Sequence, residues 1–287
     1  MSRVAIITDS SVHFPFHQLP VYEGFRILHH YIDIGDQLIP DRKDLTIYTI
    51  SGNIKNSRPR PVPPSVADFQ SIFNAISLTH SEIIVILLSE QLSHAISNAQ
   101  QAVNSFKFPA SIDIIDSQTT SAGLGFVVSE AVKAAQHGLS AHEICQLIRW
   151  ITPRIYTAFC LPDLHFIAQA HHLDPSQATV GEMLGLIPFY IMENNRLIPI
   201  QKARSQRHLV DILYEFIEEF FNIQHIALLY GLPFFEQESR NLRERIHQHF
   251  PSTAYTEHYA SSALAAMLGP HCLGMIAIEN IHGEIVN

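Results

Sequence analysis

The chain has 287 residues, of which 47% are hydrophobic and only 16% are charged, and its formal net charge at pH 7 is -9. Nucleic acids and anionic membrane surfaces both require a basic footprint on the protein, so this composition predicts no nucleic-acid binding. No apolar run approaches the ~18 residues that span a bilayer, and the opening "MSRVAIITDSS" becomes polar too early for a signal peptide, so we expect a cytoplasmic protein without membrane insertion.

The first part of the chain predicts strands and helices in alternation. Val4 to Thr8 is a short, mostly β-branched run typical of a buried strand, and residues 25–34 look extended. The segment "DLTIYTISGN", which starts at Asp44, is expected to form a short helix. After a proline-rich stretch, Ser65 opens a helix with an aspartate three residues later, which is the spacing of a capping box.

The next predicted elements continue this alternation. Ile83 to Leu88 is a continuous apolar run, as expected of a parallel strand covered on both faces. A helix at 94–106, a strand at 111–115 and a helix at 119–136 follow, and Ser140 opens another helix with capping-box spacing. This order of strands and helices predicts a mainly parallel sheet flanked by helices.

The second half of the chain predicts a different sheet. Its expected elements are a strand at 154–160, a hairpin of 188–192 and 196–201 joined by an Asn-rich turn, a helix at 206–221, a strand at 225–231, a helix at 236–249 and a closing strand at 272–279. We therefore expect two α/β domains, 1–152 with the parallel sheet and 153–287 with a mixed sheet and helices. No low-complexity linker separates them, so we expect an extensive shared interface.

Polar clusters follow three of the predicted strands of the first domain, in "TDSS", "LLSEQLS" and "IIDSQTTS". In a parallel sheet the carboxyl ends of the strands gather at one edge, and ligands bind in the crevice outside that edge. The alternative is that these residues only form Asx and Ser turns. Three such clusters favour a small polar pocket.

Metal, cofactor and nucleophilic chemistry find little support in the sequence. The chain has 18 histidines, but adjacent pairs such as His29–His30 point apart on a strand and form no joint ligand set. The three cysteines lack Cys-x-x-Cys spacing, which argues against a disulfide framework or a structural zinc site. No Walker lysine motif and no Gly-x-Ser-x-Gly elbow occurs. We expect no metal and no cofactor.

Six segments, taken in chain order, resemble the DegV family of fatty-acid-binding proteins. They are "VAIITDSS" from Val4, "PPSVADF" from Pro63, "LLSEQLSHAISNA" from Leu87, "IIDSQTTSAGLGFVV" from Ile114, "KARSQRH" from Lys202 and "GPHCLG" from Gly269. The resemblance implies two α/β domains, with the fatty-acid carboxylate at their interface and the acyl chain in an apolar tunnel of the second. It also implies a non-catalytic carrier that presents a long-chain fatty acid to a separate fatty acid kinase.

The resemblance also implies site residues. Ser93 matches the family's carboxylate-binding serine, and Ser65 lies in a second matching motif, although each residue could instead only cap a helix. Arg204 matches an arginine associated with the phosphoryl group or the partner enzyme. Asp9 would repel a carboxylate, so we expect it to fix its turn through backbone hydrogen bonds.

Several family positions are changed in this chain. Pro61 replaces a carboxylate-binding threonine, "AHHL" at 170–173 replaces a Gly-Gly-Arg-Ile turn, and Met267 replaces a histidine. Our hypothesis is that His94 or His271 supplies a lost donor to the carboxylate. The alternatives are a different lipid, or a small-molecule hydrolase or transferase that uses the inter-domain cleft with His271 or His94 as its base.

Overall fold

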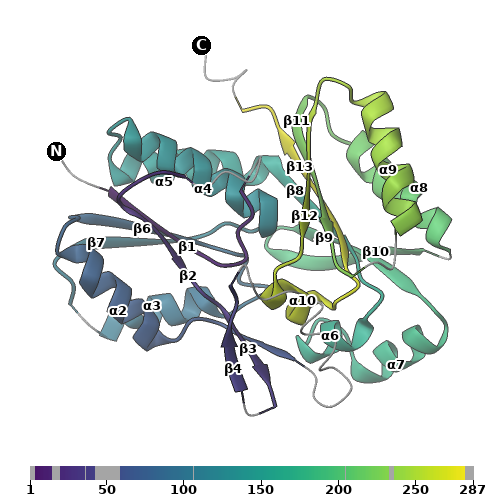
Figure 1. Ribbon diagram of the computed structural model, residues 1–287, viewed down its shortest axis with the longest axis horizontal. Coiled ribbons are helices and arrows are strands. Elements are labelled where there is room, and N and C mark those ends of the chain that lie inside the picture. The colour runs from purple at the N-terminus through teal and green to yellow at the C-terminus, as the bar shows by residue number, and fades with distance from the viewer. Residues whose placement is uncertain are drawn as a thin grey trace.

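The computed structural model describes residues 4–14, 20–35, 37–42, 59–105, 107–203, 205–232 and 236–281. These residues form two lobes, each built on one sheet, and a third, small sheet (Figure 1). Within the described ranges, no helix is long and apolar enough to cross a membrane. The helix expected at Asp44 lies outside the described residues.

The first lobe is a parallel sheet with helices on both faces. Its strands, in the order β2-β1-β6-β7, are β2 (Phe25–Leu28), β1 (Val4–Asp9), β6 (Glu82–Leu87) and β7 (Ser111–Asp116). Its helices are α2 (Val66–Ser77), α3 (Ala95–Ser105), α4 (Ser121–Gln136) and α5 (Ala141–Ile151). Helices α2 and α3 lie on one face of the sheet, and α4 and α5 lie on the other (Figure 1).

The second lobe is a mixed sheet whose two faces are covered differently. Its strands, in the order β10-β9-β8-β13-β11-β12, are β10 (Arg196–Ala203), β9 (Ile187–Glu193), β8 (Ile155–Cys160), β13 (Leu273–Glu279), β11 (Ile223–Tyr230) and β12 (Ala254–Tyr259). Only β11 and β12 pair in parallel among these described strands. Helix α4 packs on β8 and β13, whereas α8 (Gln206–Glu218) and α9 (Glu236–His249) cover the opposite face (Figure 1).

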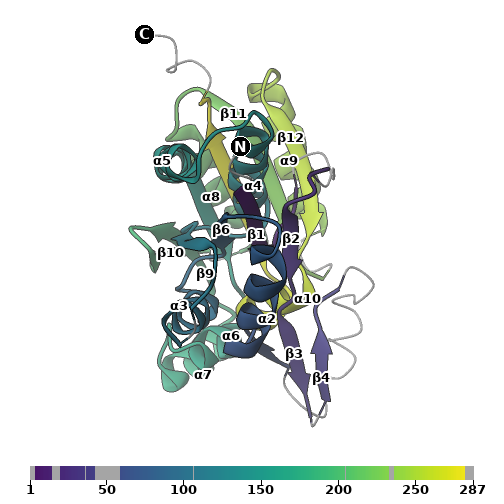
Figure 2. The same ribbon diagram turned by 90° about the vertical axis from the view of Figure 1, so that its left-hand side faces the viewer.

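The small sheet belongs to the first half of the chain but contacts the second. It has the order β4-β3-β5 and is built from β4 (Gln37–Pro40), β3 (Tyr31–Ile34) and β5 (Arg60–Val62), all antiparallel. Figure 2 shows β3 and β4 side by side. Helix α10 (Ser262–Leu268) packs on β3 and β5, and every residue of α10 is buried. Three short elements complete the described structure: η2 (Thr152–Arg154), α6 (Leu164–Gln169) and α7 (Pro175–Met183).

The predicted fold class is confirmed, and local signals located most elements. Both capping boxes are present, at Ser65 and Ser140. The hairpin turns through Asn194 and Asn195 with φ of 48° and 56°, the left-handed conformation that asparagine tolerates best after glycine. The extended segment 25–34 is divided into two strands, because Leu28 pairs with Asp9 in the first sheet whereas Tyr31 pairs with Val62 in the small one.

The expected interface between the halves is extensive. One hydrophobic cluster contains buried side chains from both, among them Ile7 of β1, Val127 of α4 and Ile276 of β13. A second cluster, which includes Phe189 and Leu213, lies between the second sheet and the helices α8 and α9. The two lobes therefore share a continuous core, and the second lobe also has a core of its own.

Candidate functional site

The polar ends of the first-lobe strands meet at one edge of the sheet, as predicted. The Ser89 N–H donates to the Thr119 carbonyl (2.9 Å), and the Ser117 N–H donates to the Leu87 carbonyl (3.1 Å), so the segments after β6 and β7 lie against each other. The Thr119 hydroxyl in turn lies 2.8 Å from the hydroxyl of Thr157 in β8. This edge of the first sheet therefore faces the second lobe.

Asp9 lies at the end of β1 and is completely buried. Its carboxylate accepts hydrogen bonds from the N–H groups of Ser11 (2.9 Å) and Leu88 (2.8 Å). Burial alone raises the pKa of the Asp9 carboxyl, but interactions with His30, Ser11 and Leu88 outweigh burial and hold that pKa below its ordinary value. Asp9 thus fixes its turn through backbone hydrogen bonds, as expected.

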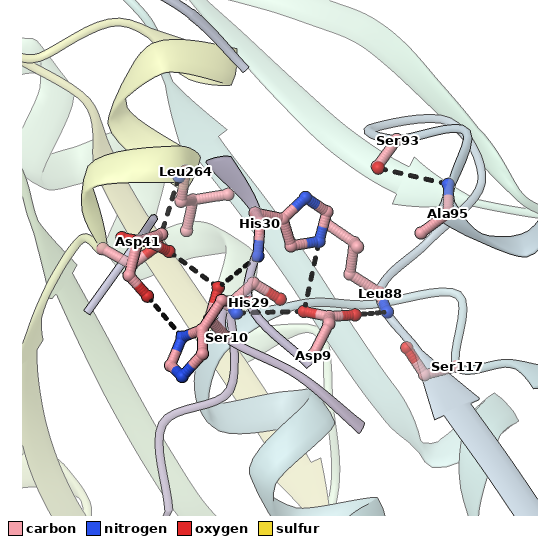
Figure 3. Close-up of polar contacts among 12 residues, drawn as sticks. Asp9, Ser10, His29, His30, Asp41, Leu88, Ser93, Ala95, Ser117 and Leu264 are labelled. Atoms are coloured by element: carbon pink, nitrogen blue, oxygen red, sulfur yellow. Dashed lines mark hydrogen bonds and ion pairs between the residues drawn. The ribbon is translucent and has the colours of Figure 1, made fainter. Parts of the chain in front are cut away.

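Ser93 is the last residue of a turn after β6, which we call the Ser89–Ser93 loop. The N–H of Ser93 donates to the Ser89 carbonyl (3.3 Å), and the Ser93 Oγ accepts from the N–H of Ala95, the first residue of α3 (3.3 Å) (Figure 3). Ser93 is 8% exposed. Its hydroxyl therefore lies at the inter-lobe edge and can still donate to a ligand, while its role in binding a carboxylate stays a prediction.

Ser65 is exposed at the start of α2, and its hydroxyl is engaged locally. The Ser65 Oγ donates to the Asp68 carboxylate (2.7 Å) and accepts from the Asp68 N–H (3.2 Å). The predicted capping box at Ser65 is confirmed, whereas the carboxylate-binding role of Ser65 stays a prediction. His94 is exposed, and Arg204 lies outside the described residues.

His271 pairs with Asp163, the residue before α6. The His271 N–H donates to Asp163 Oδ2 (2.8 Å), and the ring Nδ1 lies 3.1 Å from both carboxylate oxygens. The hydrogen bond to Asp163 raises the pKa of the His271 imidazole above its ordinary value of 6.5, although partial burial opposes the shift. His271 therefore holds the turn after α10 against the start of α6. A ligand that bound the His271 ring would have to share that ring with Asp163.

The pairing of His271 with Asp163 predicts a pH-dependent stability. Because the pKa of His271 is raised in the folded protein, the pair contributes most below pH 6.5 and its contribution is lost as the pH rises through the raised pKa. We expect Asp163→Asn to lower the free energy of unfolding more at pH 6 than at pH 9, as measured by urea denaturation. An equal loss at both pH values would contradict this assignment.

Two contacts from the second lobe reach the Ser89–Ser93 loop, and sequence reasoning missed both. His172 Nε2 donates to the Gln91 carbonyl (2.8 Å), and the Ser89 hydroxyl donates to Asn195 Oδ1 in the turn between β9 and β10 (3.0 Å). His171, the preceding residue, has a φ of 61°, which lies in the left-handed region that favours glycine. The altered "AHHL" turn therefore still contacts the predicted headgroup loop.

The second lobe contains a cavity of about 370 Å³ between strands β8, β9 and β10 and helix α8. Its lining residues are Tyr156, Thr157, Phe189, Ile191, Met192, Glu193, Ile200, Gln201, Ile212, Glu215, Phe216, Glu219 and Phe220. Four of the rings form a continuous wall, in which Tyr156 stacks on Phe220 with 3.7 Å between ring centroids and Phe216 contacts both Phe220 and Phe189. The glutamates and Gln201 are exposed at its rim.

The β9–β10 hairpin lines the cavity with its strands and contacts the inter-lobe edge with its turn. The cavity lining follows β9 as far as Glu193, and two residues later Asn195 bonds the Ser89–Ser93 loop. Fold and site together define a two-lobed α/β protein with a polar inter-lobe edge and a separate apolar cavity.

The sequence profile of the family described as "Uncharacterised protein, DegV family" matches residues 3–280. The chain belongs to the DegV family. It is 22% identical over 283 residues to a DegV domain-containing protein of Staphylococcus aureus, covering 97% of this chain and 100% of the relative. It is 21% identical over 287 residues to protein DegV of Bacillus subtilis, covering 95% and 98% of the two chains.

Solved structures of similar proteins have the same fold. A fatty-acid-binding DegV family protein of Thermus thermophilus superposes with a TM-score of 0.82 at 21% identity, over 97% of this chain and all of that one. The fatty acid kinase B3 protein of Streptococcus pneumoniae, loaded with linoleic acid, superposes with a TM-score of 0.82 at 20% identity, over 98% of this chain and all of the other. The two α/β lobes are thus those of the DegV fold.

Proposed function

We propose that this protein binds a long-chain fatty acid non-covalently and serves, in the cytoplasm, as a non-catalytic carrier for a separate fatty acid kinase. The observation that carries the proposal is the apolar cavity of the second lobe, connected by the β9–β10 hairpin to the Ser89–Ser93 loop. The names of the similar solved proteins support the same ligand class, since they include fatty-acid-binding proteins and a fatty acid kinase B3 protein loaded with linoleic acid.

The proposal divides the ligand between the two lobes. Every cavity-lining residue belongs to the segment 156–220, and the Ser89–Ser93 loop belongs to the first half. This supports a division into a headgroup domain, residues 1–152, and an acyl-chain domain, residues 153–287. Burying the tail gains ~0.8 kcal/mol per methylene, so a long chain supplies about 10 kcal/mol before association costs, while the buried carboxylate requires hydrogen-bond donors.

Mass spectrometry of lipid extracted from the purified protein tests the proposal. We expect a long-chain fatty acid in a nearly one-to-one ratio with the protein, and the pure protein should bind added oleate in solution. No lipid and no oleate binding would overturn the proposal and favour the alternative of a hydrolase or transferase in the inter-lobe cleft.

Ser93→Ala tests the headgroup position. Hydrogen bonds to charged groups contribute roughly 1.5–3 kcal/mol, so we expect the affinity for oleate to fall by about tenfold or more. Ser140→Ala is the matched control, because it removes a capping box on α5 at a cost of about 1 kcal/mol in stability and should leave the affinity for oleate unchanged. Calorimetric titration measures both variants, and an oleate affinity unchanged by Ser93→Ala would remove Ser93 from the proposed site.

Arg204 is the proposed contact with the phosphoryl group or the kinase. Exchange of Arg204 for alanine should leave the affinity for oleate unchanged and lower the rate at which a fatty acid kinase uses the loaded protein.

A further inference from the structure

His30 follows β2 and is completely buried, with 0% of its surface exposed. Neither ring nitrogen has a hydrogen-bond partner within the part of the chain that the structure describes. Buried polar atoms without partners are uncommon in folded proteins, because they lose their hydrogen bonds to water and gain none in return. A buried imidazole without a hydrogen-bond partner on either nitrogen therefore needs a physical explanation.

The backbone of His30 is held firmly in place from two sides. Its N–H donates to the hydroxyl of Ser10 (3.0 Å), and its carbonyl accepts from the N–H of Asp41 (2.8 Å). The Ser10 hydroxyl donates in turn to the Asp41 carboxylate (2.9 Å), which closes the ring of contacts (Figure 3). The imidazole is thus presented from a fixed backbone at the inter-lobe edge.

The ring lies beside Asp9 and close in the fold to the segment that leads into the Ser89–Ser93 loop. His30 Nε2 lies 3.6 Å from Asp9 Oδ1, and the other Asp9 oxygen accepts from Leu88 N–H, immediately before the Ser89–Ser93 loop. Figure 3 shows one ring nitrogen of His30 facing Asp9 and the second nitrogen directed away from Asp9. A carboxylate beside one ring nitrogen orients the imidazole and leaves the other nitrogen to bind a partner.

Resting on the proposed function, we propose that His30 Nδ1 donates a hydrogen bond to the carboxylate of the bound fatty acid, with Asp9 as the residue that positions the ring. A ring that carries a proton on both nitrogens can donate to Asp9 and to the ligand at once, and this offsets the repulsion between the two carboxylates. A charge-assisted hydrogen bond of this kind is stronger than a neutral one. The ring also gains the partner that it lacks within the described residues.

The proposal predicts a selective loss of affinity for the acid group. His30→Val should lower the affinity for oleate by about tenfold or more and leave the affinity for oleyl alcohol within about twofold, because only the acid carries the charge that His30 binds. His29→Val is the matched control, because the His29 ring forms a hydrogen bond with the Asp41 carbonyl (2.7 Å). Loss of the His29 ring should not change the ratio of the affinities for oleate and oleyl alcohol. Calorimetric titration gives both affinities.

Nitrogen-15 NMR of histidine-labelled wild-type protein provides a measurement that does not depend on a variant folding. We expect the ring nitrogen signals of His30, assigned through bonds from its backbone resonances in the wild-type protein, to shift when oleate is added and to stay in place with oleyl alcohol. The proposal would be overturned if His30→Val lowered the affinities for oleate and oleyl alcohol equally, or if the His30 signals did not move when oleate bound. The ring of His30 would then have an internal water as its partner. Failure of wild-type protein to bind oleate would instead refute the proposed function.

Discussion

Asp9→Ala is expected to lower the free energy of unfolding by about 3–5 kcal/mol, the typical cost of removing one partner from a buried, hydrogen-bonded charge. The Asp9 carboxylate is completely buried and is the acceptor for the N–H groups of Ser11 and Leu88. Alanine leaves both donors without a partner at the end of β1, and the turn beside His30 loses its anchor. Urea denaturation followed by circular dichroism measures the loss.

Asp33→Ala is the matched control for this prediction. The Asp33 carboxylate pairs with the Arg60 guanidinium at 2.6 Å, and the two side chains are 26% and 65% exposed. Exposed ion pairs contribute at most about 1 kcal/mol, so the control should remain nearly as stable as the wild type. If Asp33→Ala lowered the free energy of unfolding as much as Asp9→Ala, burial would not explain how much Asp9 contributes to stability.

Ile191→Trp is expected to abolish most fatty-acid binding, with a loss of oleate affinity of about 100-fold, or roughly 2.7 kcal/mol. Ile191 lines the cavity beside the ring of Phe189, and an indole at this position occupies space that the proposed acyl chain needs. The affinity for shorter acids, such as octanoate, should fall less than that for oleate, because a shorter tail fills less of the cavity. Calorimetric titration over a series of chain lengths measures this difference.

Val180→Trp controls for the general effect of an added tryptophan. Val180 lies on α7, outside the cavity lining, and is 54% exposed. Its replacement should leave oleate affinity unchanged. An Ile191→Trp variant that keeps wild-type affinity for long and short acids would place the acyl chain elsewhere in the molecule.

The sequence predicted those elements whose signals are local. The run at Ile83–Leu88 is apolar throughout because β6 is covered on both faces, and Ser65 and Ser140 cap helices through residues three positions away. Helix α10 and strand β12 were not expected. All residues of α10 are buried, so it has no polar face to reveal its period, and β12 carries polar side chains that weaken a strand pattern.

The candidate site was only partly predictable, because its contacts join distant positions. The polar ends of the strands indicated the correct edge, and Asp9 was expected to fix its turn. The contact between His172 and Gln91 spans 81 positions of the chain, and no local pattern encodes it. In the sequence His29 and His30 were only neighbours whose side chains point apart. The proximity of His30 to Asp9, the last residue of β1, is a result of how the strands are arranged in the fold.

The packing of α10 on β3 and β5 has a consequence for how the chain folds. A fragment corresponding to 153–287 would expose Ala266, which is 2% exposed in the whole chain and shares a cluster with Ile32 and Ile34. Neither half can therefore complete its hydrophobic interior during synthesis until the other has emerged. We expect calorimetry to record a single cooperative melting transition, and separately expressed halves to become protease-resistant only after mixing.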